Sequence, residues 1–242
     1  MSLYREQGVV LRTHKLGEAD RILVVMTQGT GKVRAVAKGV RRTSSRFGGR
    51  LEPFSHVDLS LYQGRNLDIV TQAEVVDPFK SLRADYDRVT AGSAMLEAVD
   101  VLAEDREPAV RLFLLLVRGL RALDAGPRDP SIVLDAFLLK LMALEGYRPA
   151  LVECAACGTP GRHTRFSAAR GGALCANCRS GAESLLDDAT VPLMAELLDG
   201  DLAAAGASRP RAHQRREAGN LVRSFVEYHL ERRLRSYPLV AR

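Results

Sequence analysis

Two hydrophobic periods divide the sequence near residue 78. Over the first 76 residues, apolar and polar side chains alternate with a period of two, and turn residues interrupt the alternation. From about Pro78 onward, apolar residues recur with the 3.6-residue period of amphipathic helices. The pattern predicts a multi-domain α+β protein, with a β domain in residues 1–78 and a helical domain in residues 79–242.

The β part contains five predicted strands, and one long connection follows the third. Turn sequences separate the second strand from the third (Gln-Gly-Thr-Gly) and the fourth from the fifth (Gln-Gly-Arg-Asn). This spacing favours a small five-stranded β-barrel of the OB type, and an SH3-like barrel is the alternative on strand count alone. The predicted strands cover residues 4–13, 19–27, 32–38, 54–62 and 67–75.

The helical part contains five predicted helices whose apolar stripes indicate a buried face. Pro108, Pro127, Pro130 and Pro149 mark boundaries of these helices. The predicted helices cover residues 81–104, 108–124, 131–146, 191–204 and 211–234. Between the third and the fourth, residues 153–179 interrupt the helical pattern and contain all four cysteines of the chain.

The cysteines form two C-x2-C pairs, Cys154 with Cys157 and Cys175 with Cys178, and 17 residues separate the pairs. This spacing is typical of a zinc ribbon, because a tight turn brings two sulfurs to about 3.8 Å, their separation on a tetrahedral Zn²⁺. Four thiolates complete the coordination sphere, so we predict one structural zinc per chain. A short hairpin of residues 162–167 and 173–174, turned at Gly171 and Gly172, completes the predicted ribbon.

Three other interpretations of the thiols stay open: two disulfides, an iron–sulfur cluster, or a degenerate ribbon without metal. Disulfides are rare in the cytoplasm, and the N-terminal sequence Met-Ser-Leu-Tyr-Arg-Glu lacks the pattern of a secretion signal. We therefore expect a cytoplasmic protein, and no apolar run is long enough for a membrane span. His163 lies between the two pairs, and we interpret it as a surface residue rather than a ligand.

The net charge of +6 is unevenly distributed. Residues 1–80 carry 13 basic and 8 acidic side chains, residues 81–208 carry 13 and 18, and residues 209–242 carry 9 and 3. The two ends of the chain are basic and the middle is acidic, which favours binding of a polyanionic partner by the ends. The alternative is that these charges form an ordinary solvated surface.

The segment from Arg21 to Leu51 contains eight basic residues and no acidic one. Within it, residues 39–50 are rich in Gly, Ser and Thr, which leave backbone amides free for phosphates, and Phe47 offers a stacking face for a base. On an OB-type barrel this favours nucleic-acid binding over a solvated run of charge. The basic last helix is a second candidate contact, with a solvated face as its alternative. The predicted DNA contacts are Lys32, Arg34, Lys38, Arg41, Arg42, Arg46 and Arg50.

No catalytic motif is apparent in the sequence. The Gly-Thr-Gly-Lys turn fails as a phosphate loop, because Met26 and Val33 stand where that motif needs Gly and Ser or Thr. The five histidines are scattered, and we interpret Asp187 and Asp188 as a negative charge at a helix N-terminus. We predict a binding protein rather than an enzyme, and a zinc-ribbon regulatory protein that binds a defined DNA sequence is the alternative.

Several segments resemble the RecO family of bacterial recombination mediators. The resemblance rests on GEADR at 17–21, AKGVRR at 37–42, SRFGGRLEPF at 45–54 and LRS at 234–236. It implies an N-terminal OB domain, a helical domain that carries a zinc finger in many members, binding of single- and double-stranded DNA, and annealing of complementary strands. It also implies that RecR and RecF act with the protein, at the nucleoid, to load RecA onto DNA coated by single-stranded DNA-binding protein. The cysteine quartet varies within the family, so the basic segment supports the resemblance more strongly.

Overall fold

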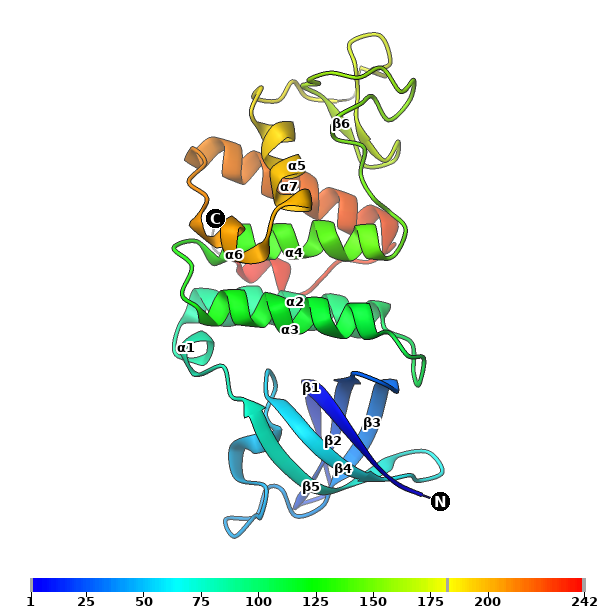
Figure 1. Ribbon diagram of the computed structural model, residues 1–242, viewed down its shortest axis with the longest axis vertical. Helices are drawn as coiled ribbons and strands as arrows, with labels where there is room; N and C mark the ends of the chain where they lie inside the picture. Colours follow the sequence, from blue (N-terminus) through cyan, green and yellow to red (C-terminus); the bar gives the residue numbers. More distant parts are fainter. Residues whose placement is uncertain (1, 182, 241–242) are drawn as a thin grey trace.

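The computed structural model describes residues 2–181 and 183–240. Figure 1 shows three parts along the long axis: a β-barrel at one end, helices in the middle, and a loop-rich segment with two short strands at the other end. The predicted α+β fold, a barrel followed by helices, is confirmed. Among the described residues, no helix combines the length and the apolar character that crossing a bilayer requires.

The barrel has five strands in the closed order β1-β2-β3-β5-β4. Neighbouring strands are antiparallel except for β3 and β5, which are parallel. This Greek-key arrangement is that of an OB barrel and confirms the predicted type. The strands are β1 (Leu3–Leu16), β2 (Asp20–Thr27), β3 (Gly31–Ala37), β4 (His56–Tyr62) and β5 (Asp68–Asp77).

Strands β1 and β2 are buried on both faces at their centres. Val10 and Val25 pair with each other and point into the barrel, whereas Val9, Val24 and Met26 pack in the core of the helices. This double burial explains why the apolar residues here form continuous runs instead of a strict alternation.

The described helices are shorter than the sequence predicts at three places. They are α1 (Lys80–Arg83), α2 (Tyr86–Leu102), α3 (Val110–Asp124), α4 (Pro130–Leu144), α5 (Thr190–Asp199), α6 (Leu202–Ala207) and α7 (Ala212–His229), with short 3₁₀ turns η1 (Gly48–Leu51) and η2 (Tyr237–Leu239). The single helix predicted for 81–104 is wrong, because the Asp85 side chain accepts a hydrogen bond from the Arg88 amide and begins α2 anew. The single helix predicted for 191–204 is wrong for the same reason, since Asp201 caps α6.

The helix predicted for 211–234 ends at His229. Glu231 has a positive φ of 50°, a left-handed conformation that an α-helix cannot contain. The chain turns back there, and the Tyr237 hydroxyl reaches the buried carboxylate of Asp135 at 3.0 Å. The last apolar residues therefore cover the helical core instead of extending α7.

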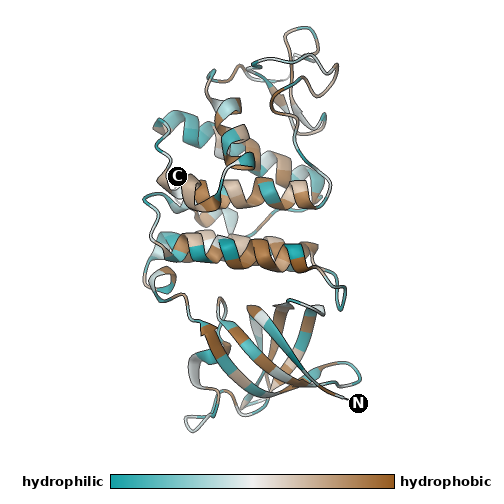
Figure 2. Cartoon of the chain, viewed as in Figure 1, coloured by the Kyte–Doolittle hydropathy of each residue, from teal (hydrophilic) through white to brown (hydrophobic). Residues whose placement is uncertain are grey.

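Helix α4 is the centre of the helical part. Eleven of its residues are buried, and it packs against α2, α3, α5, α6 and α7. Figure 2 shows α4 brown over most of its length, whereas the N-terminal part of α7 is teal. A helix that is apolar on all sides needs such complete cover, so α4 organises the other helices around it.

Charged groups and a close backbone approach join the barrel to the helices. The Lys32 ammonium donates to the Asp100 carbonyl oxygen at 2.8 Å and lies 3.8 Å from the carboxylate of the same residue. Next to Lys32, whose carbonyl accepts from the Arg106 amide, the Arg106 guanidinium bonds the fully buried Asp68 carboxylate at 2.6 Å. A side chain at Gly31 would meet the Glu107 backbone at 1.9 Å. The barrel and α2–α3 therefore meet in a close, polar junction.

His56 is a buried titratable residue in this junction, 4% exposed, with its ring edge-on to Phe113 at 5.7 Å. Within the described residues, neither ring nitrogen has a hydrogen-bond partner. Burial lowers the pKa of His56 below its ordinary value, Arg121 lowers it further, and Asp77 acts in the opposite direction. The folded protein therefore holds His56 neutral.

We expect His56 to make the protein acid-labile. Because its pKa is lower in the folded state, the unfolded chain binds more protons as the pH falls below about 6.5, and stability declines there. Replacing His56 by Leu should reduce the fall in Tm between pH 7 and pH 5 by about 2–4 °C, the shift that about 1 kcal/mol produces at this chain size. Thermal melts at both pH values test this. The exposed His14→Ala control should behave like the wild type, and an unchanged pH dependence in His56→Leu would contradict the assignment.

Candidate nucleic-acid interface and metal site

The connection between β3 and β4 contains a basic loop, residues 39–50, that three buried side chains fix to the barrel. Val40, Phe47 and Leu51 belong to the core inside the barrel. Phe47 is only 2% exposed, so the stacking face predicted for it is wrong. The Arg46 guanidinium covers the Phe47 ring at 4.8 Å from the centroid. The loop is thus folded onto the barrel, with its arginines outside.

Polar bonds fix the start of the loop as well. The Gly39 amide donates to the Asp20 carboxylate at 2.7 Å, and the Arg41 amide donates to the Ala19 carbonyl at 2.9 Å. Where the loop ends, Arg21 forms an ion pair of 2.5 Å with Glu52. A loop held at both ends presents its charges in a defined arrangement, which lowers the entropic cost of binding.

The structure separates the seven predicted DNA contacts into two groups. Six of them have exposed side chains: Arg34 and Lys38 on β3 or just after it, and Arg41, Arg42, Arg46 and Arg50 in the basic loop. Lys32 is different, because its ammonium group is turned to α2 and lies near the carboxylates of Asp100 and Asp105. The structure therefore does not bring Lys32 to the basic loop.

The six exposed cations have no acidic partner in the part of the chain that the structure describes. Arg41 donates to the Gly17 carbonyl and Arg50 to the Arg46 carbonyl, both neutral acceptors. An uncompensated group of cations on one surface produces a positive potential that attracts polyanions. The charge and its exposure are both suited to phosphate contacts.

A groove runs between the basic loop and β5, and no pattern in the sequence predicts it. Arg46 and Arg50 line one side, and Thr71 and Gln72 line the other, around a volume of about 570 Å³. The groove places hydrogen-bonding side chains beside two cations. Glu74 is the one carboxylate among the lining residues.

The four cysteine sulfurs gather at one point, all within 4.8 Å of one another. The sulfurs of Cys157 and Cys175 are 3.8 Å apart, close to the separation of about 3.8 Å for two thiolates on a tetrahedral zinc. All four are free thiols, so the two-disulfide interpretation is wrong for this structure. The set could hold a metal ion.

Main-chain amides stabilise the thiolate form of Cys154 in this cluster. The Cys175 amide points at the sulfur of the buried Cys154, 3.4 Å away, and this contact is the main cause that lowers the pKa of Cys154 to about 6. Gly158 adopts a positive φ of 70° and closes the first turn by donating to the Cys154 carbonyl. Hydrogen bonds with Cys157 and Cys175 stabilise the protonated thiol of Cys178 and raise its pKa, and the nearby charge of Cys154 raises it further. A bound cation would favour the thiolate form of all four cysteines, because metal ligands must be deprotonated.

The hairpin of the ribbon is shorter than predicted, with strands β6 (Phe166–Ser167) and β7 (Gly172–Ala173). Its turn is formed by residues 168–171, so Gly172 lies in a strand and not in the turn, contrary to the prediction. Gly172 is required because its backbone packs on Ala150, where an added Cβ would meet the carbonyl oxygen at 2.2 Å. His163 is buried rather than on the surface, and its ring contacts the Thr159 carbonyl at 3.0 Å.

The ribbon is part of the helical core. Leu151, Phe166 and Leu186 are buried in the same cluster as the helices, and the Phe166 ring lies edge-on to Phe225 of α7 at 5.9 Å. Loss of order in the ribbon would therefore expose part of the core of the helices.

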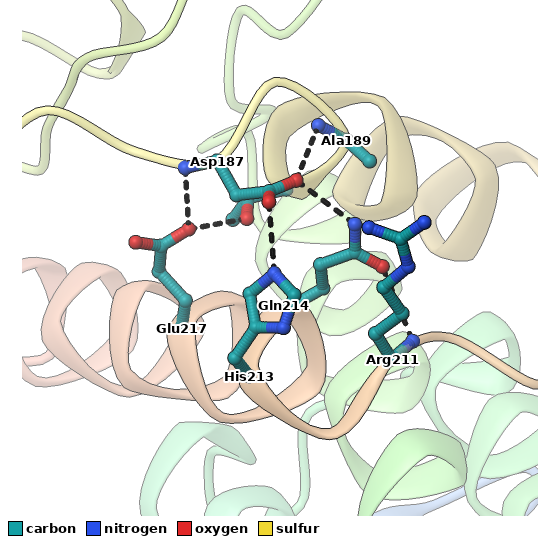
Figure 3. Close-up of polar contacts among 7 residues, drawn as sticks. Asp187, Ala189, Arg211, His213, Gln214 and Glu217 are labelled. Carbon is teal, nitrogen blue, oxygen red and sulfur yellow. Dashed lines mark hydrogen bonds and ion pairs between the residues drawn. The ribbon is translucent and has the colours of Figure 1, made fainter.

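Asp187 fixes the exit of the ribbon to the first turn of α7 (Figure 3). It accepts hydrogen bonds from His213 and Gln214, both at 2.8 Å, and from the Ala189 amide at 3.0 Å. The bond from His213 is the main cause that lowers the pKa of Asp187 to about 2. Asp187 lies two residues before Ala189, the N-cap of α5, and the first turn of α5 contains no acidic residue, so the predicted charge at a helix N-terminus stays a prediction.

A second groove lies between α3 and α4 on the helical part. It has a volume of about 360 Å³, and its lining combines four leucines with four cations. Two of these cations are held in place by other residues. Lys140 donates to the Leu198 and Gly200 carbonyls, and Arg148 forms an ion pair with Asp199. We call this the leucine–arginine groove: Arg111, Leu114, Leu115, Arg118, Lys140, Ala143, Leu144, Arg148 and Leu198.

Together, the OB barrel, the basic loop and the four-thiol ribbon define the class of protein: an OB-barrel protein with an accessory helical part and a candidate metal site. A family model described as "Recombination protein O N terminal" matches residues 1–79, and one described as "Recombination protein O C terminal" matches residues 83–238. The chain belongs to the RecO family, and this confirms the resemblance in the sequence. Membership indicates a role in DNA repair and recombination.

Curated relatives support the assignment over the whole length. The chain is 53% identical to the DNA repair protein RecO of Nocardioides sp. (strain ATCC BAA-499 / JS614), over 99% of this chain and 100% of the relative. It is 52% identical to the protein of the same name from Frankia casuarinae (strain DSM 45818 / CECT 9043 / HFP020203 / CcI3), over 100% of both chains. Identity to the Thermobifida fusca (strain YX) protein is 51%, again over 100% of both chains.

Proposed function

We propose that the protein is a recombination mediator that binds single- and double-stranded DNA and anneals complementary strands without catalysing a reaction. One observation carries the proposal: the basic loop presents arginines without acidic partners on an OB barrel, in the described part of the chain. Contacts to phosphates are independent of sequence, so such a surface accepts any strand. The predicted contacts Arg34, Lys38, Arg41, Arg42, Arg46 and Arg50 stay in the proposal, and Lys32 serves the junction.

We infer that Cys154, Cys157, Cys175 and Cys178 hold one structural zinc. The pairing of C-x2-C turns and the sulfur separations support zinc over an iron–sulfur cluster. Four protein ligands leave no position for water, so the metal when bound supplies cross-linking rather than Lewis-acid chemistry. The chain's own contribution is the arrangement of amides that favours thiolates.

We infer that the protein works with RecR and RecF to load RecA onto DNA coated by single-stranded DNA-binding protein. The leucine–arginine groove supports contact with a partner protein, because it fits a peptide that carries carboxylates beside an apolar side chain. Such a contact would recruit the protein to coated strands, at the nucleoid in the cytoplasm.

We also propose the division into an OB domain of residues 1–78 and a helical domain of residues 79–242. The interior of the barrel forms one core, and the helices form another. The second core includes Val9, Val24 and Phe54 of the barrel part, so we expect the two domains to stabilise each other.

Strand annealing by the pure protein tests the proposed function. Two complementary oligonucleotides with a fluorophore and a quencher should pair faster with the protein than without it, and nucleotide should be unnecessary. A shared scaffold raises the local concentration of the strands, which speeds pairing without a chemical step. Binding without faster pairing would favour a DNA-binding regulatory protein instead.

A further inference from the structure

Two exposed tyrosines flank a histidine where α4 leads into the ribbon and α7 ends. The Tyr147 and His229 ring centroids are 4.7 Å apart, with an interplanar angle of 31°, and Tyr228 stands edge-on to His229 at 5.2 Å. Tyr147 is 46% exposed and Tyr228 is 52% exposed. Large aromatic side chains gathered in solvent mark an interaction surface.

Buried aromatic residues of the core pack against these rings. His229 lies edge-on to the buried Phe225 at 4.4 Å, and Phe225 in turn contacts Phe166 of the ribbon. Burial lowers the pKa of His229, so its ring is a neutral part of this stack. Rings held in this way are already ordered, and stacking a flat ligand on them costs little conformational entropy.

Cations lie beside Tyr228, one member of this aromatic group. A groove of about 500 Å³ is lined by Tyr228 together with Arg223, Arg232 and Arg233. Arg223 pairs with Glu227 at 3.0 Å, whereas Arg232 and Arg233 are exposed and form no ion pair within the residues described. Glu231 is the other carboxylate in the groove, and its left-handed conformation makes the turn that carries the two arginines. We call the set the aromatic–arginine face: Tyr147, Arg223, Tyr228, His229, Arg232 and Arg233.

We propose that the aromatic–arginine face binds a second single strand of DNA, with bases stacked on Tyr147 and Tyr228 and phosphates held by Arg232 and Arg233. Exposed aromatic faces beside cations are the combination that binds unpaired bases and their backbone. A duplex does not fit this chemistry, because its bases are already stacked on one another.

The position of the face gives it a role in the proposed function, on which this inference rests. Figure 1 shows α7 beyond the layer of α2 and α3 as seen from the barrel. The basic loop and the aromatic–arginine face therefore lie on different parts of the molecule. One chain can hold two strands at once, as annealing requires.

Photo-cross-linking on the full-length protein tests the site directly. An oligonucleotide that contains 5-iododeoxyuridine should cross-link to peptides with Tyr147 or Tyr228, and a duplex of the same sequence should not. Replacing both tyrosines by Ala should remove these cross-links and slow annealing at least about tenfold, since each stacked base is worth about 1–3 kcal/mol, or roughly 5- to 150-fold in affinity. The affinity of the double Ala variant for a single strand at the basic loop should stay within about threefold of the wild-type affinity.

Matched variants separate stacking from folding and from general charge. Tyr86→Ala removes a tyrosine that is 71% exposed on α2, and it should anneal like the wild type. Tyr147→Phe with Tyr228→Phe keeps both ring faces and should also retain annealing. Arg232→Glu with Arg233→Glu should slow annealing, whereas the exposed pair Lys80→Glu with Arg209→Glu should not.

The outcomes distinguish the site from the proposed function. Cross-links confined to the barrel, together with normal annealing by the double Ala variant, would overturn the second site and leave the mediator function standing. Cross-links to the tyrosines in a wild-type protein that does not anneal would support the site and reject the function. Equal cross-linking by the duplex would also overturn the inference.

Discussion

Replacing Cys154 and Cys175 by Ser should release the metal and lower the Tm by about 10 °C or more. Metal binding at a four-cysteine site contributes on the order of 10 kcal/mol near neutral pH. At this chain size each kcal/mol lost corresponds to about 2–4 °C. The effect should reach the helices, because Leu151, Phe166 and Leu186 join the ribbon to the helical core. Metal analysis of protein purified without chelator, beside a thermal melt, gives both results.

The control adds the same hydroxyl groups without removing a thiol. Ala156 and Ala176 are exposed alanines between the cysteines of the two turns, so Ala156→Ser with Ala176→Ser should keep the metal and the Tm. Iron in place of zinc, or no metal in the wild type, would contradict the assignment. A chelator should reproduce the Tm of the cysteine variant in the wild type and change the variant little.

Reversing Arg41, Arg42 and Arg46 to Glu should weaken DNA binding at least about tenfold, and equally for all sequences. Each phosphate contact that is lost should flatten the slope of log K against log salt by about 0.7 for single strands, so three contacts should flatten it by about 2. The side chains are exposed and form no ion pair in the described structure, so the fold should tolerate the change. Fluorescence anisotropy titrations at several salt concentrations measure both quantities.

A triple reversal elsewhere controls for net charge. Arg162, Arg170 and Arg179 are exposed on the ribbon, and changing them to Glu alters the total charge by the same amount. If both variants lose affinity equally, the effect is a general one of charge rather than of the basic loop. An unchanged affinity and slope in the loop variant would place the main contact elsewhere.

Local patterns predicted the barrel well because turn sequences separate its strands and because parts of the strands follow a period of two. At the start of β3, Val33 and Ala35 are buried while Arg34 between them is exposed, as alternation requires, although Val36 is buried as well. The four-cysteine site was also predictable, because the spacing of two ligands within a tight turn is a local property of the sequence. Helix breaks were missed at Asp85 and Asp201, although an Asp at the N-cap position is a signal that the sequence does contain.

The misplaced residues depend on contacts far along the chain. Lys32 looked like a DNA contact because its acidic partner, Asp100, lies 68 residues away. Phe47 looked exposed because its neighbours are polar, and no local pattern shows that it returns to the barrel core. Likewise, the groove at Gln72 and the aromatic–arginine face bring together residues from separate elements. Such sites exist only in the folded chain, so composition alone could not predict them.

The most direct test of the account is annealing on strands already coated by single-stranded DNA-binding protein, measured by fluorescence quenching with and without ATP. We predict pairing well above the uncatalysed rate, equal in both conditions, and strongly reduced in the Arg41, Arg42 and Arg46 reversal. This result would follow from binding alone, through two surfaces that hold two strands on one chain. A requirement for ATP, or a rate no faster than without the protein, would contradict the mediator function.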